Sequence, residues 1–541
     1  MKRVVLAALL CLSLVGSVRA QGTDPTPTPT GGPGPARKFD STHVKLAEGY
    51  LIEPVVINLS VPTTAIFDGD DLLVAESGWA KTAPPRVLRI RPDGTSSVIA
   101  SIGLVGPVTG LLVIDGELYI SHKGKVSVLQ ADGSLKDIVT GLPSNGDHQN
   151  NNIVLGSDGK IYMGQGTVTN SGVVGEDSYI FGWLPEAPTA LEIPCKDITL
   201  VGTNFESGNP LTESDDKATT GAYKPFGTPG SEGETITGDP KCGGSILRFN
   251  RDGSGLEVVA WGMRNPFGLE VDGSGQLWAT YHGADVRGSR NIFNDPDYLV
   301  RVEEGAWYGW PEFFDGVAVT DPRFKDPTKP QPEFLWRDHP PVAKAFATFQ
   351  SHAGINGLDF SPRGAFGFEG DAFVAMFGTF APVTTGIDVR PAGFSVVRVD
   401  VDSAEVSTFA ENVLPGPAYI NQQLGMNRPS DLVFAPDSSL YVVDWGASTI
   451  TDEGLKLQPL TGAVWRIYRE DMPRARPQGA VQVVAAPQIP EEERKPEVLN
   501  VPEAWGMISG PVGLLCGIGL LAIIALFLVW RVLRGRSKKA E

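Results

Sequence analysis

The residue types best suited to chemistry lie in the polar stretch "LPSNGDHQNNNIVLGSDGKIYMGQG", residues 142–166. Asp147 and His148 are adjacent in it, and its first half has no apolar period. A histidine titrates near neutral pH and can take up a proton from a substrate, and a neighbouring carboxylate can orient its ring. The pair is therefore either a general base with its orienting acid or a solvated surface turn.

A repeated unit of two strands must position these residues. An acidic turn, usually with Gly, precedes a short apolar strand near residues 68, 115, 158, 272, 369 and 436. A second apolar strand follows near residues 86, 125, 244, 297, 393 and 463. A lone strand pair cannot bury its apolar face, whereas six four-stranded sheets around an axis can. The sequence predicts an all-β, six-bladed β-propeller with insertions in its third and fourth units, against a generic sandwich.

In a propeller, loops from every blade meet at the mouth of the central channel. Polar residues in those loops converge there, so we expect the ligand site at that end of the fold. Asp147 and His148 precede a predicted strand and fall at such a position.

The two ends of the chain predict a secreted, membrane-anchored protein. Residues 1–20 have a basic start and a short apolar core, which is typical of a signal peptide, with an uncleaved anchor as the alternative. Residues 507–530 carry no charge and precede a basic tail at 531–541. This pattern predicts one transmembrane helix, with the rest of the chain on the extracellular or periplasmic side. A Thr/Pro/Gly-rich linker at 21–39 and a Pro/Glu-rich stalk at 471–506 flank a folded domain at 40–470.

Cysteine usage agrees with an oxidising compartment. Of the 4 cysteines, Cys11 lies in the predicted signal peptide and Cys516 in the predicted membrane helix. We expect Cys195 and Cys242 to form a disulfide that closes an inserted loop. The net charge of -18 argues against nucleic acid as a partner.

Several motifs together resemble a known family. They are Asp-His-Gln at 147–149, "GMRNPFGL" from residue 262, Tyr-Gly-Trp-Pro at 308–311 and "NRPSDLVFAPDSSLYVVDWG" from residue 427. Over about residues 45–468 the chain is similar to the pyrroloquinoline quinone (PQQ)-dependent soluble glucose dehydrogenase and L-sorbosone dehydrogenase family. The resemblance implies a six-bladed propeller that oxidises a sugar or polyol. Hydride passes to PQQ in this family, and Ca²⁺ polarises the quinone.

The resemblance also implies roles for individual residues. His148 falls on the general base of the family and Asp147 on its acidic neighbour. The positions that contact PQQ match Arg264, Asn265 and Arg428, while Thr379 stands near the family's cofactor lysine. Guanidinium groups suit the carboxylates of PQQ, although inter-blade ion pairs or strand packing also explain arginines here. The backbone carbonyls that hold Ca²⁺ in the family match Gly283 and Ala284.

Other positions depart from the family. Val108 and His282 replace glutamines, and Ser430 replaces the second arginine of an Asn-Arg-x-Arg pattern. These changes fit the more variable sorbosone-type branch or a propeller that has lost its cofactor. His352 is a further candidate for the channel. For Tyr308 and Trp310 we favour a structural role in the core over stacking on a sugar.

Three functions remain open on the sequence. The first is a membrane-tethered quinoprotein dehydrogenase that passes electrons to a membrane quinone or a small redox protein. It has no attached c-type haem, because Cys-x-x-Cys-His is absent. The second is a non-catalytic surface propeller that binds carbohydrate or protein. The third is a propeller hydrolase such as a lactonase, with a metal held by Glu76, Asn152, Asn265 and Asp431.

Overall fold

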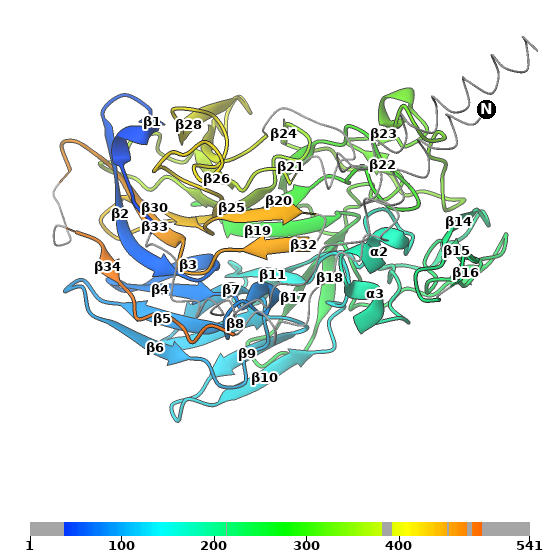
Figure 1. The fold of residues 1–541 in the computed structure, drawn as a ribbon, viewed down its shortest axis with the longest axis horizontal. Coiled ribbons are helices and arrows are strands. Elements are labelled where there is room, and N and C mark those ends of the chain that lie inside the picture. Colours follow the sequence, from blue (N-terminus) through cyan, green and yellow to red (C-terminus); the bar gives the residue numbers. More distant parts are fainter. Residues whose placement is uncertain (1–36, 213, 381–391, 452–453, 473–478, 490–541) are drawn as a thin grey trace, which may run out of the picture. The chain divides into compact units, whose positions relative to one another are not determined.

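Within the residues that the structure describes, six sheets of four or five strands follow one another along the chain (Figure 1). The structure is a computed structural model, and it describes residues 37–212, 214–380, 392–451, 454–472 and 479–489. The first strands of successive sheets contact each other in a closed ring, from β3 through β7, β11, β19 and β25 to β29 and back. The predicted six-bladed β-propeller is confirmed.

Each sheet is one blade, built outward from its inner strand. Blade 1 has β3 (Pro62–Asp68), β4 (Asp71–Glu76), β5 (Arg86–Ile90) and β6 (Ser96–Ala100). Blade 2 has β7 (Val108–Ile114), β8 (Glu117–His122), β9 (Lys125–Leu129) and β10 (Leu135–Thr140). Blade 3 has β11 (Asn150–Leu155), β12 (Ile161–Gln165), β17 (Ser245–Phe249) and β18 (Glu257–Trp261).

The second half of the ring is built in the same way. Blade 4 has β19 (Asn265–Val271), β20 (Leu277–His282), β21 (Asp297–Arg301) and β24 (Ala347–Phe349). Blade 5 has β25 (Ile355–Phe360), β26 (Ala372–Met376), β27 (Ser395–Val399) and β28 (Val406–Asn412), with β1 (Val44–Leu46) at its edge. Blade 6 has β29 (Pro429–Phe434), β30 (Leu440–Asp444) and β33 (Gly462–Arg469), followed by β2 (Tyr50–Leu59) and β34 (Val481–Gln482).

The acidic turns of the sequence form the hairpins of the blades. Asp272 Oδ1 accepts a hydrogen bond from the Ser274 backbone N–H at 2.8 Å, and Asp437 Oδ1 accepts one from that of Ser439 at 2.9 Å. An Asp side chain that bonds two residues ahead stabilises a tight turn. The strand after such a turn is the second of its blade, where blades pack on both faces, so β4, β26 and β30 are almost wholly buried. This burial explains the apolar runs that revealed the repeat.

Apolar clusters join neighbouring blades. Leu73, Val87 and Leu111 pack between blades 1 and 2, and a corresponding cluster lies at each of the other five junctions in the described part of the chain. Burial of apolar surface contributes roughly 25 cal/mol per Å², so these junctions are the main source of the ring's stability.

The ring is closed by an N-terminal strand. β2 pairs antiparallel with β33, although Tyr50 and its partner Arg469 are far apart in sequence. Ahead of β2, β1 and the short 3-10 helix η1 (Ser41–His43), the chain is fixed by Arg37, whose Nη2 lies 2.7 Å from Asp444 Oδ2. β34 pairs parallel with β2. Residues 479–489 of the predicted stalk therefore lie against the propeller.

Insertions occur in blades 3 and 4, as predicted. The first, between β12 and β17, contains α2 (Glu176–Ile180), α3 (Trp183–Glu186), β13 (Ile198–Thr199), β14 (Asn204–Gly208), β15 (Lys217–Gly221) and β16 (Thr235–Ile236) (Figure 1). The second, between β21 and β24, contains β22 (Phe313–Phe314), β23 (Val317–Ala318) and η3 (Pro322–Phe324). Two smaller elements lie in loops, η2 (Trp79–Lys81) and the hairpin of β31 (Ser448–Thr451) with β32 (Gly454–Leu457).

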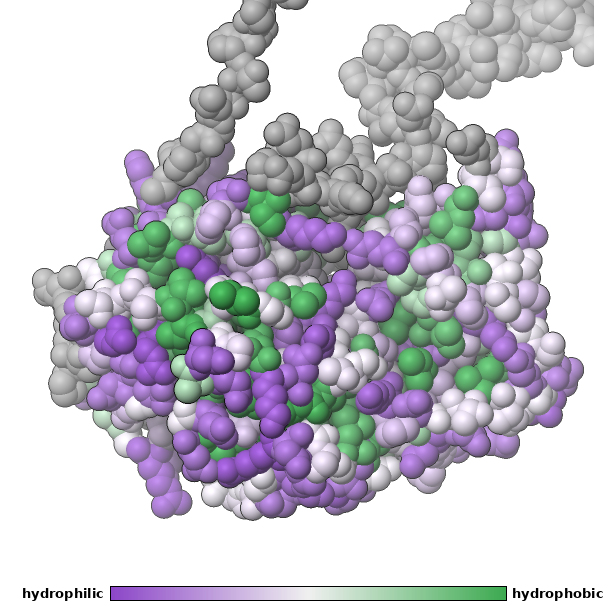
Figure 2. All heavy atoms as spheres, turned by 90° about the horizontal axis from the view of Figure 1, so that it is seen from below, coloured by the Kyte–Doolittle hydropathy of each residue, from purple (hydrophilic) through white to green (hydrophobic). Residues whose placement is uncertain are grey.

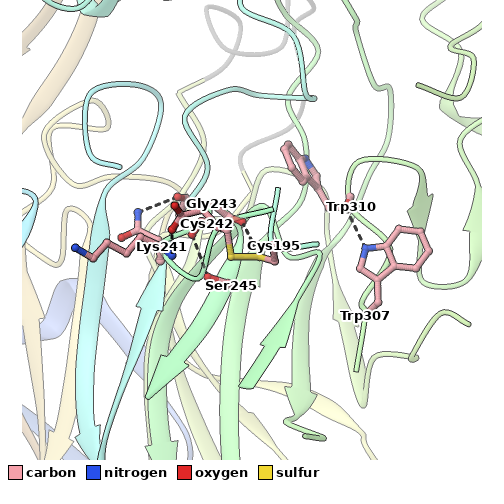
Figure 3. The surroundings of a disulfide bond; sticks show 10 residues. Cys195, Lys241, Cys242, Gly243, Ser245, Trp307 and Trp310 are labelled. Atoms are coloured by element: carbon pink, nitrogen blue, oxygen red, sulfur yellow. Dashed lines mark hydrogen bonds between the residues drawn. A yellow bond between two sulfur atoms is a disulfide. The ribbon is translucent and has the colours of Figure 1, made fainter. Parts of the chain in front are cut away.

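A disulfide joins Cys195 to Cys242 across the first insertion, which confirms the predicted pair (Figure 3). Both cysteines are buried, and they pack with Trp261, Trp307 and Trp336. Because Cys242 lies just before β17, the disulfide holds the insertion next to blade 3.

The predicted signal peptide at 1–20, most of the linker and the predicted membrane helix at 507–530 lie outside the described residues. No helix in the described ranges is long and apolar enough to cross a membrane. One face of the molecule has hydrophilic side chains over most of its area, with hydrophobic ones in patches between them (Figure 2).

Candidate active site

A cavity of about 310 Å³, here called the central cavity, lies where the inner strands of the blades begin. Each blade contributes a residue at or next to the first residue of its inner strand, namely Thr63, Pro107, Gln149, Asn265, Asn356 and Ser430. The central cavity therefore lies at the end of the channel where the sequence predicted a ligand site.

Asp147 and His148 reach the central cavity from the loop between β10 and β11. Their backbone N–H groups donate to Val168 and Thr167 carbonyls, each at 2.9 Å, and so fix the loop against blade 3. His148 Nδ1 is buried, has no hydrogen-bond partner in the part of the chain that the structure describes, and lies 3.8 Å from Asp147 Oδ2. That separation is within ion-pair range but longer than a hydrogen bond. Their roles as base and orienting acid stay predictions.

Two arginines hold the Asp147 carboxylate. Asp147 Oδ2 accepts hydrogen bonds from Arg264 Nη2 at 2.8 Å and from Arg287 Nη2 at 2.5 Å. Asp285 Oδ2 accepts from the same Arg264 nitrogen and from Arg287 Nε, both at 3.0 Å. Arg287 Nη1 also donates to Asp177 Oδ2 of α2 at 2.6 Å. The network connects the β10–β11 loop, the first insertion and the loop after β20.

Burial and these charges set the protonation states. Burial, together with Arg264, His282 and Arg287, lowers the pKa of His148 to about 3, although Asp147 opposes the shift. Burial acts to raise the pKa of Asp147, but Arg287, His148 and Arg264 together lower it to about 2. At neutral pH His148 is therefore an uncharged imidazole and Asp147 is a carboxylate.

Amide groups fix His282 and Asn265 together. Asn151 Nδ2 donates to Asn265 Oδ1 at 2.7 Å, and Asn265 Nδ2 lies 3.1 Å from His282 Nδ1. On its other side, His282 Nε2 lies 2.8 Å from Asn356 Oδ1. The imidazole that replaces a family glutamine is thus held from two blades, with its ring centroid 6.3 Å from that of His148.

Arg428 and Thr379 meet on the opposite side of the central cavity. Arg428 Nη1 donates to the Gly378 carbonyl at 2.9 Å and to the Thr379 carbonyl at 3.3 Å. Its guanidinium lies 3.9 Å from the Phe380 ring centroid, and burial lowers its pKa to about 10. Thr379 lines the cavity, and Arg428 lies behind it. The wall here is aromatic, with Trp79, Phe377, Phe380 and Trp445.

Ser430 and Val108, two residues that depart from the family pattern, lie in different places relative to the central cavity. Ser430 lines the central cavity and donates from Oγ to the Pro62 carbonyl at 3.1 Å. Val108 is fully buried and is not part of the lining. Ser430 therefore affects the shape and charge of the site directly, whereas Val108 packs between blades 1 and 2.

The carbonyls predicted to hold Ca²⁺ do not form a preformed site. The Gly283 carbonyl accepts a hydrogen bond from Arg264 Nη1 at 2.7 Å. The Ala284 N–H donates to Asp295 Oδ2 at 2.5 Å. Nowhere in the described ranges does a group of three or more His, Cys, Asp or Glu side chains gather to hold a metal. Because Ca²⁺ requires six or more oxygen ligands, these residues do not fit the ion as they stand, and its binding stays a prediction.

The remaining candidate residues divide into those that line the central cavity and those that do not. His352 lines the central cavity, with Nδ1 at 3.2 Å from Asp285 Oδ1. Tyr308 and Trp310 are buried in the core between blades 3 and 4, as predicted. Of the four residues proposed for a hydrolase, Asn265 alone lines the cavity. Glu76 is paired with Arg86, and Asp431 Oδ2 accepts from Thr64 Oγ1 at 2.6 Å.

Sequence reasoning missed Arg287, Asp285 and Asp177. Arg287 and Asp285 lie in "GADVRGSRN", residues 283–291, directly after β20. Charged residues in a Gly-containing loop at the end of a strand were a usable signal, because such loops meet at the channel mouth. Asp177 gave no comparable signal, since its position depends on the fold of the insertion.

These features define the protein class as a six-bladed β-propeller with a polar, histidine-containing central cavity. The profile of the glucose/sorbosone dehydrogenase family matches residues 235–388, which confirms the resemblance drawn from the motifs. No curated protein matches the sequence.

Solved structures share the fold. The holo form of the PQQ domain of pyranose dehydrogenase from Coprinopsis cinerea has a TM-score of 0.50 at 16% identity, covering 80% of this chain and 98% of that one. The calcium structure of a Trichoderma reesei enzyme of Carbohydrate-Active Enzymes Family AA12 has a TM-score of 0.48 at 14% identity, covering 81% and 100%. The PQQ-bound aldose sugar dehydrogenase of Streptomyces coelicolor has a TM-score of 0.45 at 16% identity, covering 79% and 100%. At such identities the likeness concerns the fold.

Proposed function

We propose that this protein is an oxidoreductase that oxidises a sugar or polyol with PQQ as the hydride acceptor. One observation carries the proposal. Among the residues that the structure describes, three buried donors around the central cavity lack acceptors: Arg264 Nε and Trp445 Nε1 on its lining, and Arg428 Nε behind it. A buried donor without an acceptor is costly. A ligand rich in carboxylate and carbonyl oxygens, as PQQ is, would satisfy such donors.

The residues present fit that cofactor on chemical grounds. Arg264 and Asn265 on the lining would hold its oxygens, because guanidinium and amide N–H groups match carboxylates and carbonyls, and Arg428 behind the lining would add positive charge. The aromatic wall of Trp445, Phe377 and neighbouring rings suits a flat conjugated ring system. When bound, PQQ supplies acceptance of a hydride.

The chain's own contribution is a neutral base. His148 lines the cavity and is uncharged at neutral pH, so one ring nitrogen is free to take the substrate's hydroxyl proton. Its pKa of about 3 makes it a weak proton acceptor. Asp147 stabilises the imidazolium, and Arg264 and Arg287 oppose it.

A second candidate function is a cofactor-free binding propeller. It is favoured by the pairing of Arg264 and Arg287 with Asp147, Asp285 and Asp177. These carboxylates already neutralise the two guanidinium groups, so less positive charge is left for a tricarboxylate. In this case the central cavity would bind a neutral carbohydrate or a protein loop.

We infer an outward-facing protein that is anchored by residues 507–530. Support comes from the charge pattern of this segment and from the Cys195–Cys242 disulfide, which is typical of oxidising compartments. Electrons would then pass to a membrane quinone or a small redox protein.

The test is a titration of the purified domain, residues 37–489, with PQQ in the presence and absence of Ca²⁺. We expect a rise in melting temperature with PQQ and dye reduction with aldoses or polyols. His148→Gln should retain PQQ binding and lose turnover by about 100-fold or more, the usual contribution of a general base. If PQQ changes neither absorbance nor melting temperature, the enzyme proposal fails and the binding propeller is favoured.

A further inference from the structure

A second cavity adjoins the first. It has a volume of about 540 Å³ and is here called the side cavity. The first insertion contributes α2 and β14 to its lining, the loop after β20 contributes residues 287–291, and the second insertion contributes residues 329–333. Phe181 and Arg287 line both cavities, so the two share a wall.

Buried polar side chains form part of the lining of the side cavity. The Asp177 side chain is 8% exposed, and its Oδ2 binds Arg287. Its Oδ1 has no hydrogen-bond partner among the described residues. A buried carboxylate oxygen without a donor is costly, which indicates that a ligand donor, such as a hydroxyl group, completes it. Ser289 and Asn291 on the same lining add groups that donate and accept.

The shared wall has a flat apolar surface. Phe181 stacks on Trp183 with ring centroids 5.0 Å apart, and Trp183 lines the central cavity. Arg287 lies over the Phe181 ring at 5.1 Å. Phe205 adds another ring to the lining of the side cavity. Rings beside hydrogen-bonding groups suit a molecule with apolar faces and polar edges.

The charges of the lining disfavour a strongly charged ligand. Glu176, Glu206 and Glu333 stand beside Lys329 and Arg290, so neither sign dominates. A neutral polyhydroxyl ligand matches this mixture. The central cavity, at about 310 Å³, is at the small end for ligand sites and has no room for several sugar rings beside a cofactor.

We propose that the side cavity binds the further sugar units of a neutral oligosaccharide whose reducing end occupies the central cavity. This inference rests on the proposed function, because it names the substrate class of the same site. The chain of sugars passes over Phe181, and the hydroxyl groups of its next units bind Asp177 and Asn291.

The experiment compares malto- and cello-oligosaccharides of one to five units with the PQQ-loaded protein. We expect kcat/KM to rise at least about tenfold from one unit to three in one series, a gain that one or two added hydrogen bonds supply. Ser207→Trp, which fills the side cavity from β14, should abolish the gain. Ser214→Trp places the same side chain on the turn of the same hairpin but outside both cavities, and should preserve it.

Binding is measured as well, by calorimetry with the cofactor-free protein. Tighter binding of the trimer than of the monomer, lost in Ser207→Trp but kept in Ser214→Trp, supports the side cavity even if no sugar is oxidised. In that event only the oxidoreductase proposal fails. A kcat/KM and an affinity that do not increase with chain length in either series, or a gain that survives Ser207→Trp, overturns the inference.

Discussion

Asp147 and Arg287 form a 2.5 Å hydrogen bond between side chains 140 residues apart in the sequence. This contact joins the loop that carries His148 to the loop after β20. Through its other nitrogens Arg287 reaches Asp285 and Asp177, so one side chain positions the predicted base, the cavity wall and the first insertion together. The following predictions test this arrangement and the fold around it.

Asp147→Asn should destabilise the protein. The variant keeps the shape of the side chain but leaves Arg264 and Arg287 buried with one less negative charge. We expect a loss of about 3 kcal/mol in the free energy of unfolding, measured by urea denaturation, as for other broken buried pairs. Asp321→Asn removes an exposed pair with Arg323 and serves as the control, with no measurable change expected. Equal effects of the two variants would contradict the network's importance.

The stability of the protein should fall as pH decreases from 7 to 5, in part because of His148. The pKa of His148 is about 3 in the folded protein against 6.5 for an exposed histidine, so between these values the unfolded chain binds a proton that the folded chain does not. Folding is then disfavoured by about 2 kcal/mol at pH 5 relative to pH 7 through this group alone. His148→Gln should lose that part of the slope. The check is urea denaturation of both proteins at pH 7, 6 and 5; parallel curves would show that His148 is not buried and neutral.

Removal of the Cys195–Cys242 disulfide should loosen the first insertion. The bond closes a loop with a sequence separation of 47, for which loop-closure entropy gives about 4 kcal/mol. In a Cys195→Ser, Cys242→Ser double variant we expect faster proteolysis within residues 196–241, measured by mass spectrometry, while the blades remain protected. The variant should also be insensitive to reductant, unlike the native protein. Uniform cleavage along the chain would instead indicate a role in the whole ring.

Arg37 should stabilise the closure of the ring. It donates to Asp444 Oδ2 at 2.7 Å and to the Gly425 and Thr461 carbonyls at 2.5 and 2.6 Å. Arg37→Met leaves the buried Asp444 carboxylate with fewer donors, so we expect a loss of about 3 kcal/mol in unfolding free energy. A domain that starts at residue 40 should show the same loss as the substitution. A domain from residue 40 as stable as one from residue 37 would refute the role.

The fold was predictable because its repeat lies in buried strands. The second and third strands of each blade are apolar and follow turns such as those of Asp272 and Asp437, so pattern alone identified them. The outer strands of the blades have no such pattern in the sequence. β6 and β10 mix polar and apolar residues and are only partly buried, and β2 joins a blade whose other strands begin at residue 429. Pairing across such a distance leaves no local pattern.

The sequence predicted which residue types form the candidate site, but only part of the contacts between their side chains. His148 and Asn265 were identified by motif, Thr379 was named only as standing near the family's cofactor lysine, and all three line one cavity. The partner of Asp147 was expected to be His148, whereas its carboxylate contacts Arg264 and Arg287 at hydrogen-bond distance. Such ion pairs join segments with independent sequences. Their geometry follows from the fold, and residue spacing alone does not determine it.

The position of β2 has a consequence for synthesis of the chain. β2 leaves the ribosome among the first strands, but its partner β33 begins at residue 462. At translation rates of about 5–20 residues per second, the ring stays open for roughly twenty seconds or more. During that time one edge of β2 has unpaired backbone groups that can bind a second nascent chain. Production of this protein therefore depends on whatever shields that edge until the last blade is complete.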